Sequence, residues 1–233
     1  MLNSIAIIPA RSGSQRIKSK NIKKFLGVPI ISYSIEIAKK SGLFKKIIVS
    51  TDSNKIAKLA TNLGAEVPFL RPKYLSDDFS TTADVIKYTI KNLDKDTLEY
   101  KYVCCISATA PFLRTKYLLD SFKIINKDKC NYVFGVTNFS YPIERSFKIK
   151  NNSPSMNFPK FYNSRSQDIK LSYHDAGIFY WGKKTAWENK IKIFDKKTYC
   201  YRIKNLLVQD IDTIDDWNLA LCKYRFINNK EKI

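Results

Sequence analysis

The sequence of 233 residues has a single histidine, seven glycines and five cysteines. No cysteines have the Cys-x-x-Cys or Cys/His spacing of a zinc site, so we expect reduced thiols and no structural zinc. Neither the Gly-x-Gly-x-x-Gly fingerprint of dinucleotide-binding proteins nor the Gly-Lys-Ser/Thr ending of a Walker A loop occurs. No apolar run is long enough to cross a membrane, and the N-terminus lacks the features of a signal peptide. We therefore expect a cytoplasmic protein with no membrane partner.

The charge is strongly unbalanced. Lys and Arg number 41 against 21 Asp and Glu, which gives a net charge of +20. Such an excess suggests a nucleic-acid partner. However, it is mostly lysine, is spread along the whole chain, and comes without an arginine-rich arm, zinc-finger spacing or an aromatic RNA-binding motif. We therefore expect no nucleic-acid partner and assign the charge to attraction of anionic substrates. A basic nucleic-acid-binding protein remains the alternative from another class.

Apolar runs of strand length alternate with stretches of helical periodicity. Strands are predicted at residues 5–8, 46–50, 102–106 and 132–136, and helices at 28–40, 56–63, 83–93 and 118–125. This alternation predicts an α/β fold with a mainly parallel sheet, and the length fits one domain over residues 1–233. Ligands of such sheets bind beyond the carboxyl ends of the strands. The segments that follow the predicted strands are therefore the candidates for a site.

The segment after the first strand combines small and basic residues. Pro9 ends that strand because it has no amide hydrogen to donate to the sheet. Ser12, Gly13 and Ser14 would let backbone amides approach a ligand closely. Four cations surround them: Arg11, Arg16, Lys18 and Lys20. The combination predicts a polyphosphate site, and the alternative is an ordinary turn with solvated lysines.

Two acidic residues close the patterned part of the chain. In the stretch from Leu206, a predicted strand delivers Asp210-Ile211-Asp212, so the side chains of Asp210 and Asp212 would lie on one face of the strand. Two carboxylates on one face, directed at a polyphosphate, suit Mg²⁺. The alternative is a helix N-cap box, in which Asp212 or Thr213 is followed by Asp215 and Asp216. Both functions are compatible, with the cap formed by the last two of these residues.

The motif Ile-Pro-Ala-Arg-x-Gly-Ser, followed by Lys-x-Lys-Asn-Ile, resembles the nucleotide loop of the nonulosonate cytidylyltransferases, which make CMP-sialic acid and related sugars. Four more blocks resemble this family and follow in its order. The resemblance implies a three-layer, Rossmann-like nucleotidyltransferase fold. It also implies transfer of CMP from CTP to the anomeric hydroxyl of a nonulosonic acid, with release of pyrophosphate.

The resemblance also implies roles for individual residues on the nucleotide side. Arg71 precedes a proline and is held extended, and it lies in a segment similar to the cytosine-reading part of the family. A planar guanidinium is a suitable donor to the cytosine carbonyl. The implied nucleotide-binding residues are Arg11, Ser12, Gly13, Ser14, Lys20, Asn21, Arg71, Thr81 and Thr82. The implied catalytic residues are Arg11, Lys20 and Asp212. The Ser/Thr/Asp cluster around Ser80 also suits a helix N-cap, which is the alternative there.

Three motifs resemble the pseudaminic acid branch of the family: Ala-Thr-Ala-Pro-Phe-Leu, Asn-x-Arg-Ser-Gln-Asp and Tyr-His-Asp-Ala-Gly. Ser107 stands where the sialic-acid enzymes have a sugar-contacting glutamine, which implies a different sugar. The implied sugar-binding residues are Ser107, Thr109, Arg165, Gln167, His174 and Asp175. Arg165 would bind the substrate carboxylate as a bidentate pair. N-acetylneuraminic and legionaminic acid are the alternative sugars, and turn-forming or structural roles are the alternatives for Ser107, Thr109 and His174.

Further implications concern the metal, the proton acceptor and the assembly. The motif Ile-Asp-Thr-x-x-Asp resembles the metal-binding end of the family, so Asp210 and Asp212 are implied as ligands of Mg²⁺. The general base stays open between solvent, one of the aspartates and His174. Residues from about 138 to 172 are rich in Asn, Ser and Pro. In the family this region is an inserted dimerisation and sugar-binding extension, so a homodimer is implied.

Overall fold

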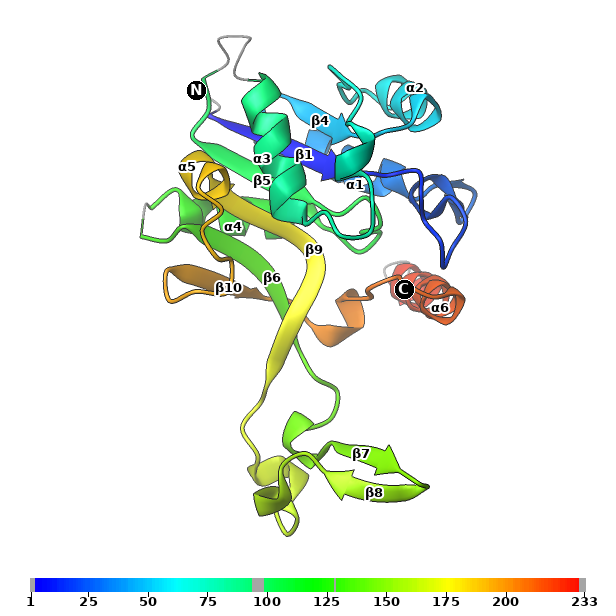
Figure 1. Ribbon diagram of the computed structural model, residues 1–233, viewed down its shortest axis with the longest axis vertical. Helices are drawn as coiled ribbons and strands as arrows, with labels where there is room; N and C mark the ends of the chain where they lie inside the picture. Colours follow the sequence, from blue (N-terminus) through cyan, green and yellow to red (C-terminus); the bar gives the residue numbers. More distant parts are fainter. Residues whose placement is uncertain (1–2, 94–98, 128, 231–233) are drawn as a thin grey trace.

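A twisted sheet of six strands, in the order β10-β6-β9-β5-β1-β4, forms the centre of the molecule (Figure 1). The structure, a computed structural model, describes residues 3–93, 99–127 and 129–230. The strands of the sheet are β1 (Ser4–Pro9), β4 (Ile47–Ser50), β5 (Tyr102–Ile106), β6 (Tyr132–Asn138), β9 (Tyr173–Lys183) and β10 (Thr198–Arg202). The helices are α1 (Ile31–Ser41), α2 (Asn54–Asn62), α3 (Thr82–Leu93), α4 (Thr115–Ile125), α5 (Lys184–Glu188) and α6 (Ile214–Lys230).

The sheet is mainly parallel, as predicted. Strand β1 pairs in parallel with β4 on one side and with β5 on the other, and β10 pairs in parallel with β6. Strand β9 is the exception, because it runs antiparallel to both β5 and β6. The carboxyl ends of β1, β4 and β5 therefore meet at one edge of the sheet, where parallel α/β folds place their ligands.

Helices cover both faces of the sheet and give three layers. Side chains of β1 alternate, so Ala6 and Ile8 pack towards α1, α2 and α4, whereas Ile5 and Ile7 pack towards α3 and α5. The neighbouring cysteines of β5 divide in the same way, with Cys104 in the first core and Cys105 in the second. This confirms the prediction that adjacent residues of this strand face opposite sides of the sheet.

A third apolar cluster connects the first loop with the last helix. Its buried members are Ile17, Phe25, Ile30, Phe112, Ile211, Trp217 and Ala220. The ring of Phe25 lies at its centre, with edge-to-face contacts to Tyr33, Trp217 and Tyr224 at 5.5–5.6 Å between centroids. Because Ile17 belongs to the first loop and Ile211 stands between Asp210 and Asp212, the cluster sets those two segments against each other.

Several predicted elements differ from the structure. Helix α4 begins at Thr115 and not at residue 118, and helix α2 begins at Asn54 and not at residue 56. Helix α1 starts at Ile31 and not at residue 28, because Val28–Pro29 forms strand β3, which pairs with β2 (Lys24–Phe25) through a tight turn at Leu26 and Gly27, both with positive φ. The strand predicted to carry Asp210-Ile211-Asp212 does not form. Asn205–Leu207 is a short 3-10 turn and residues 208–212 have no regular structure, because the edge of the sheet next to β6 is taken by β10.

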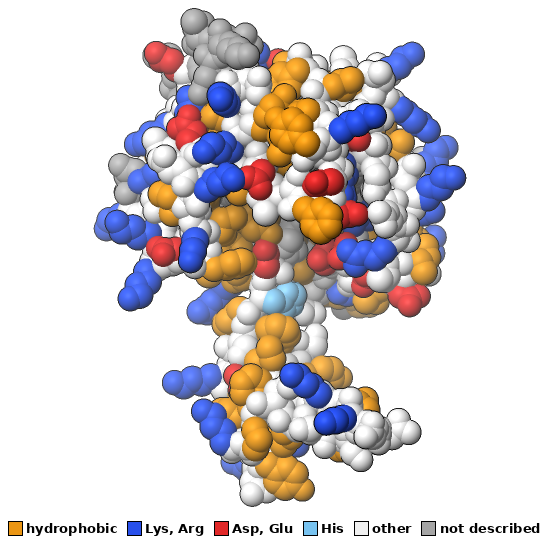
Figure 2. Space-filling view, viewed as in Figure 1, with side chains coloured by type: hydrophobic (Ala, Val, Ile, Leu, Met, Phe, Trp, Pro, Cys, Tyr) orange, Lys and Arg blue, Asp and Glu red, His pale blue; other side chains and the backbone are white. Residues whose placement is uncertain are grey.

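The chain between β6 and β9 stands apart from the main body (Figure 1). It contains a small antiparallel hairpin of β7 (Phe147–Lys150) and β8 (Ser153–Met156) and several 3-10 turns. Many of its large apolar side chains are exposed (Figure 2): Tyr141, Ile143, Phe147, Ile149, Phe158, Tyr162 and Leu171. We call residues 139–172 the extension. Among the described residues, no helix has the length and apolarity that a membrane span requires.

Candidate active site

A cleft of about 390 Å³ opens at the carboxyl ends of the central strands. Pro9 at the end of β1 and Ser107 after β5 form part of its floor. The lining includes nine of the residues predicted for nucleotide, sugar or metal: Arg11, Ser14, Lys20, Asn21, Arg71, Thr82, Ser107, Thr109 and Asp212. These residues come from five separate parts of the chain, and the parallel topology brings them to one edge of the sheet.

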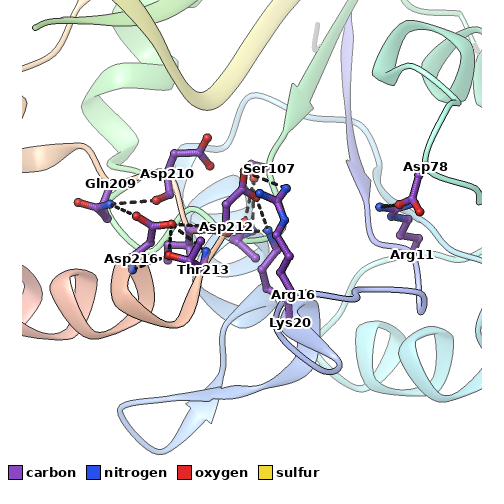
Figure 3. Close-up of polar contacts among 12 residues, drawn as sticks. Arg11, Arg16, Lys20, Asp78, Ser107, Gln209, Asp210, Asp212, Thr213 and Asp216 are labelled. Atoms are coloured by element: carbon purple, nitrogen blue, oxygen red, sulfur yellow. Dashed lines mark hydrogen bonds and ion pairs between the residues drawn. The ribbon is translucent and has the colours of Figure 1, made fainter. Parts of the chain in front are cut away.

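Arg11 reaches across the cleft to the segment before α3. Its guanidinium donates to the carbonyl oxygen of Asp77 and to the carboxylate of Asp78, both at 2.5 Å (Figure 3). Gln15 donates to the other oxygen of the same carboxylate at 3.1 Å. The side chain of Asn21 donates to the carbonyl of Arg11 at 2.9 Å, which fixes the backbone at the start of the loop. The first loop and the segment at 77–78 are thus joined across the cleft.

Ser12 is held from behind the loop by Asp52. The Ser12 amide donates to one carboxylate oxygen at 2.8 Å, and the Ser12 hydroxyl donates to the other at 2.6 Å. Burial opposes ionisation of Asp52, but the two hydrogen bonds from Ser12 outweigh it and lower the pKa of this carboxyl. The amide of Ser14 donates to the Ser12 carbonyl at 3.0 Å, so the loop turns tightly at Gly13. A Cβ built on Gly13 meets no atom within 4 Å, which shows that this side of the turn is open.

Two cations of the first loop meet Asp212. The Lys20 ammonium donates to Asp212 Oδ1 at 3.1 Å and to the Ile211 carbonyl at 2.5 Å, and the Arg16 guanidinium lies 3.2 Å from Asp212 Oδ2 (Figure 3). Asp212 thus balances the positive charge of the loop. Helix α6 begins just after it with a capping box, in which Thr213 and Asp216 exchange hydrogen bonds between side chain and backbone. The cap uses Asp216, as predicted, but its partner is Thr213, and Asp215 takes no part in the described hydrogen bonds of the cap. Asp212 lines the cleft.

Asp210 lies beside this pair and is exposed as a whole residue, whereas Asp212 is half-buried, but protein atoms partly desolvate the Asp210 carboxyl. Burial raises the pKa of the Asp210 carboxyl, the negative charge of Asp212 raises it further, and the charge of Lys20 opposes both. A Cβ built on Gly177 would stand 3.8 Å from the Asp210 carboxylate, so β9 approaches it closely. Within the described ranges, no group of three or more His, Cys, Asp or Glu side chains is arranged to hold a metal ion alone. A pair of carboxylates does suit Mg²⁺, which completes its shell with phosphate oxygens and water.

Arg71 is a buried cation in the wall of the cleft. It is only 5% exposed, and its Nε donates to the Ser76 hydroxyl at 3.1 Å. Burial lowers the pKa of the guanidinium, and the charge of Arg11 adds to this effect, whereas the charge of Asp52 opposes it. The guanidinium pKa nevertheless starts so high that Arg71 stays charged at neutral pH. A desolvated cation at the wall of a cleft is suited to bind an electronegative ligand atom.

The two threonines after Ser80 have different positions. Thr81 is the N-cap of α3, where its hydroxyl and amide meet the Asp84 carboxylate at 2.5 and 3.3 Å and the Asp84 amide donates back to Thr81 Oγ1 at 3.2 Å. Thr82 lines the cleft. The Ser80 hydroxyl instead donates to the Tyr74 carbonyl at 3.0 Å. The capping function foreseen for this cluster is therefore real, and Thr81 performs it.

The far wall of the cleft is formed by the turn after β5 and by β9. The hydroxyls of Ser107 and Thr109 lie 3.3 Å apart, and both line the cleft. Tyr180 of β9 also lines it, and its hydroxyl donates a short hydrogen bond to Asp175 Oδ2, while Asp175 Oδ1 accepts the Gly177 amide at 2.8 Å. Both oxygens of Asp175 are thus used within the protein, and Asp175 acts on the cleft through Tyr180.

The structure does not bring the other predicted sugar-binding residues to this cleft within one chain. The His174 ring packs on Phe139 at 4.8 Å, and its Nδ1 lies 2.8 Å from the carbonyl oxygen of Asp175. Arg165 and Gln167 lie in the extension, where Arg165 forms an ion pair with Asp168 at 2.7 Å. Arg165 is largely exposed there, with 73% of its side chain accessible.

The predicted site residues do not include Asp52, Asp78 or Tyr180, although Asp52 follows a predicted strand at the edge where ligands are expected. Each contacts a predicted site residue or lines the cleft, but none belongs to a motif that carries chemistry by itself. The position of Asp52 directly after a predicted strand was the one available signal, because that edge of the sheet was already the expected site.

The chain is similar to known proteins in both sequence and structure. The sequence model of the family described as Cytidylyltransferase matches residues 5–232. The chain is 41% identical over 225 residues to pseudaminic acid cytidylyltransferase of Campylobacter jejuni, which covers 96% of this chain and 97% of that protein. It is 28% identical over 217 residues to N-acylneuraminate cytidylyltransferase of Escherichia coli, covering 93% of this chain and 51% of that one.

A third curated relative is a larger protein of Helicobacter pylori named pseudaminic acid cytidylyltransferase and UDP-2,4-diacetamido-2,4,6-trideoxy-beta-L-altropyranose hydrolase. It is 40% identical over 212 residues, covering 90% of this chain and 40% of that protein. Among solved structures, CMP:2-keto-3-deoxy-manno-octonic acid synthetase complexed with CTP superposes with a TM-score of 0.70 at 13% identity, covering 97% of this chain and 99% of that one. At that identity the likeness establishes the fold, and it confirms the predicted three-layer, Rossmann-like nucleotidyltransferase architecture.

Proposed function

This chain belongs to the cytidylyltransferase family, and we propose that it transfers CMP from CTP to the anomeric hydroxyl of pseudaminic acid, releasing pyrophosphate. Membership makes it a CTP-dependent nucleotidyltransferase. The observation that carries the proposal is the cleft itself, because Arg11, Lys20 and Arg71 all line it at the carboxyl edge of the sheet. The choice of sugar rests on the likeness over nearly the full chain to enzymes named for pseudaminic acid.

The nucleotide would lie along the first loop. Arg11 and Lys20, with Arg16 beside them, supply positive charge for the triphosphate, which is the main requirement of phosphoryl transfer. Asn21 holds the backbone of Arg11, and the buried guanidinium of Arg71 is a fixed planar donor for the cytosine carbonyl. Ser12, Gly13 and Ser14 form the turn beneath the phosphates, and Thr82 at the start of α3 completes the nucleotide wall.

The acceptor sugar would occupy the wall formed by Ser107, Thr109 and Tyr180. From there its anomeric oxygen attacks the α-phosphorus, a new P–O bond forms, and the bond to the β-phosphate oxygen breaks. The hydroxyl proton passes to water or to a carboxylate at the cleft, and the leaving pyrophosphate stays paired with the loop cations. The protein's contribution is alignment of the two substrates and neutralisation of the phosphate charge.

Asp212, which lines the cleft, and Asp210 beside it, which is not among the lining residues, are the residues that would hold Mg²⁺. When bound, the ion supplies charge neutralisation at the phosphates and lowers the pKa of a coordinated hydroxyl. Asp212 already faces two loop cations, so the same carboxylate can fix the position of Lys20 and Arg16 before substrates arrive.

The extension supports a homodimer. The extension has no hydrophobic core of its own, and its large apolar side chains are exposed. Exposed apolar surface of this kind is typical of a protein–protein interface. Burial of these side chains against a second copy would direct Arg165 and Gln167 towards the partner's cleft, and His174 at the base of the extension would help to fix its direction. The five free cysteines fit a reducing compartment, and we assign the reaction to the cytoplasm.

The test is pyrophosphate release in the presence of CTP and Mg²⁺, with pseudaminic, legionaminic and N-acetylneuraminic acid compared at equal concentration. Release with pseudaminic acid alone supports the whole proposal. Release only with one of the other two sugars keeps the chemistry and overturns the choice of sugar. If none reacts and the protein instead retains an oligonucleotide in low salt, the proposal fails in favour of nucleic-acid binding.

A further inference from the structure

Asp52 contacts the first loop from outside the cleft. It lies two residues beyond the end of β4, next to β1, whose Pro9 pairs with Ser50. Its carboxylate accepts the amide and the hydroxyl of Ser12 at 2.8 and 2.6 Å, so both oxygens serve a single residue of the loop. Among the described residues that line the cleft, Asp52 is absent. Its effect on a bound nucleotide must therefore pass through its neighbours.

The same short turn also holds Arg71. The buried carbonyl of Thr51 accepts the Arg71 amide at 2.7 Å, which places this residue next to Asp52 on the neighbouring segment. Arg71 and Arg11 are two cations in one cleft, and Arg71 is almost fully desolvated. The Asp52 carboxylate near Arg71 offsets part of the free energy needed to desolvate the Arg71 charge. The electrostatic effect of Asp52 on the Arg71 pKa has the sign that this arrangement requires.

The Asp52 carboxylate is not needed to cap α2 or to close the turn before it. The N-cap of α2 is Ser53, whose hydroxyl accepts the Ile56 amide at 3.4 Å. The Ser53 amide in turn donates to the Thr51 hydroxyl at 3.2 Å. The turn and the helix start are therefore satisfied without the Asp52 carboxylate, which is left to bind the loop.

We infer that Asp52 is a positioning residue for CTP: it fixes the phosphate loop through Ser12 and balances the charge of Arg71, so that both walls of the nucleotide site are preset. The inference rests on the proposed function, because it assigns these walls to the triphosphate and the base. By this inference Asp52 acts on the nucleotide and not on the sugar. None of the described hydrogen bonds joins the turn that contains Asp52 to the sugar wall at Ser107, Thr109 and Tyr180.

The substitutions separate the two effects. Asp52→Ala removes the hydrogen bonds and the charge, whereas Asp52→Asn keeps an acceptor for the Ser12 amide and removes only the charge. Ser12→Ala removes the hydroxyl and keeps the amide. Asp195→Asn is the matched control, because Asp195 also accepts a backbone amide in an exposed turn, that of Lys197, and is not among the residues that line the cleft.

The measurement is the Kd of CTP, of inorganic tripolyphosphate and of cytidine for each variant, with the KM of the sugar. We expect Asp52→Ala to weaken CTP roughly tenfold to a hundredfold, the range for losing hydrogen bonds to a charged group. Ser12→Ala should weaken the binding of tripolyphosphate. Asp52→Asn should weaken the binding of cytidine. The sugar KM should stay within about twofold of the wild type, since a merely structural loss would affect both substrates. Adding Ser12→Ala to Asp52→Ala should have no further effect.

Unchanged CTP affinity in Asp52→Ala, or additive effects in the double variant, would overturn the inference. Equal losses for CTP and the sugar would also overturn it, because they indicate a general loss of folding. If Asp52→Ala does not fold, Asp52→Asn and Ser12→Ala decide through the tripolyphosphate and cytidine affinities. Failure of the wild-type protein to bind CTP would overturn the proposed function itself, an outcome that the wild-type control distinguishes.

Discussion

The guanidinium of Arg11 lies 2.5 Å from the carboxylate of Asp78, a residue 67 positions further along the chain. The proposed reaction assigns Arg11 to the triphosphate. In the structure, however, Arg11 is already paired with a carboxylate of the protein itself. The pair is partly exposed, with 34% of the Arg11 side chain and 51% of the Asp78 side chain accessible, so its net stabilisation is small. A triphosphate with several negative charges can displace it.

Substitution of Asp78 should therefore strengthen CTP binding. We expect Asp78→Asn to lower the KM of CTP by about two- to fivefold, because the phosphates no longer compete with a carboxylate for Arg11. Asp78→Glu keeps the charge and is the control, for which no gain is expected. Steady-state kinetics at saturating sugar measure the effect. A higher KM in Asp78→Asn would contradict the prediction and would indicate that Asp78 orients Arg11 for the substrate.

Substitution of Asp212 tests the proposed metal pair. Asp212→Asn should lower kcat by roughly a hundredfold or more, since one of two carboxylates for Mg²⁺ is lost and the partner of Lys20 and Arg16 becomes neutral. The thermal stabilisation by CTP that depends on Mg²⁺ should disappear as well, while the melting temperature of the free protein changes little. Full activity of the variant would remove Asp212 from the metal role.

How far the sequence predicts this site depends on the range of each contact. Buried strands such as Ser4–Pro9 are apolar on both faces, so they and the cleft at their carboxyl ends follow from local pattern. Strand Thr198–Arg202 has no apolar run and forms because it pairs with β6, which no local signal reveals. The pairs Arg11 with Asp78 and Ser12 with Asp52 are also invisible in the sequence, because they join residues 67 and 40 positions apart.

Tyr180 offers a test of the sugar wall. Tyr180 lines the cleft. Tyr180→Phe keeps the ring, which stacks on Phe134 at 5.9 Å, but removes the hydroxyl that binds Asp175. The KM of the sugar should rise about tenfold, in the range for a lost hydrogen bond to a polar ligand, with the KM of CTP within twofold. Tyr199→Phe on exposed β10 is the matched control. A larger effect on CTP than on the sugar would exclude Tyr180 from the sugar wall.

Arg165 tests whether the extension serves another subunit. Arg165→Ala should raise the KM of the sugar far more than that of CTP, and Lys160→Ala in the same extension should not. If Arg165 acts in the partner's cleft, then mixing Arg165→Ala with Asp212→Asn protein should restore activity, because one cleft of each mixed dimer is complete. Random exchange of equal amounts makes about half of the dimers mixed, and one of the two clefts in each mixed dimer is complete. The mixture should therefore reach about a quarter of the wild-type rate. No recovery after verified subunit exchange would confine Arg165 to its own chain, and equal effects on both substrates would point to a structural role.

Phe25 links the stability of the third core to the geometry of the cleft. Its ring is fully buried between Tyr33, Trp217 and Tyr224, and the same cluster contains Ile17 and Ile211, which precede Lys20 and Asp212 in their segments. Phe25→Ala should reduce the free energy of unfolding by about 3 kcal/mol or more. The substitution would leave a cavity next to the segments that carry Lys20 and Asp212. The KM of CTP should therefore rise as well, at temperatures where the variant is fully folded.

Phe122→Ala provides the comparison for that prediction. Phe122 packs on Trp181 and Tyr102 in the core around α4, away from the first loop. Its loss should reduce stability by a similar mechanism and leave the KM of CTP unchanged. Chemical unfolding and steady-state kinetics on the two variants then separate folding from positioning. If Phe25→Ala lowers stability with an unaltered KM, the contact between Lys20 and Asp212 is maintained by charge alone, and the aromatic cluster has no part in setting the cleft.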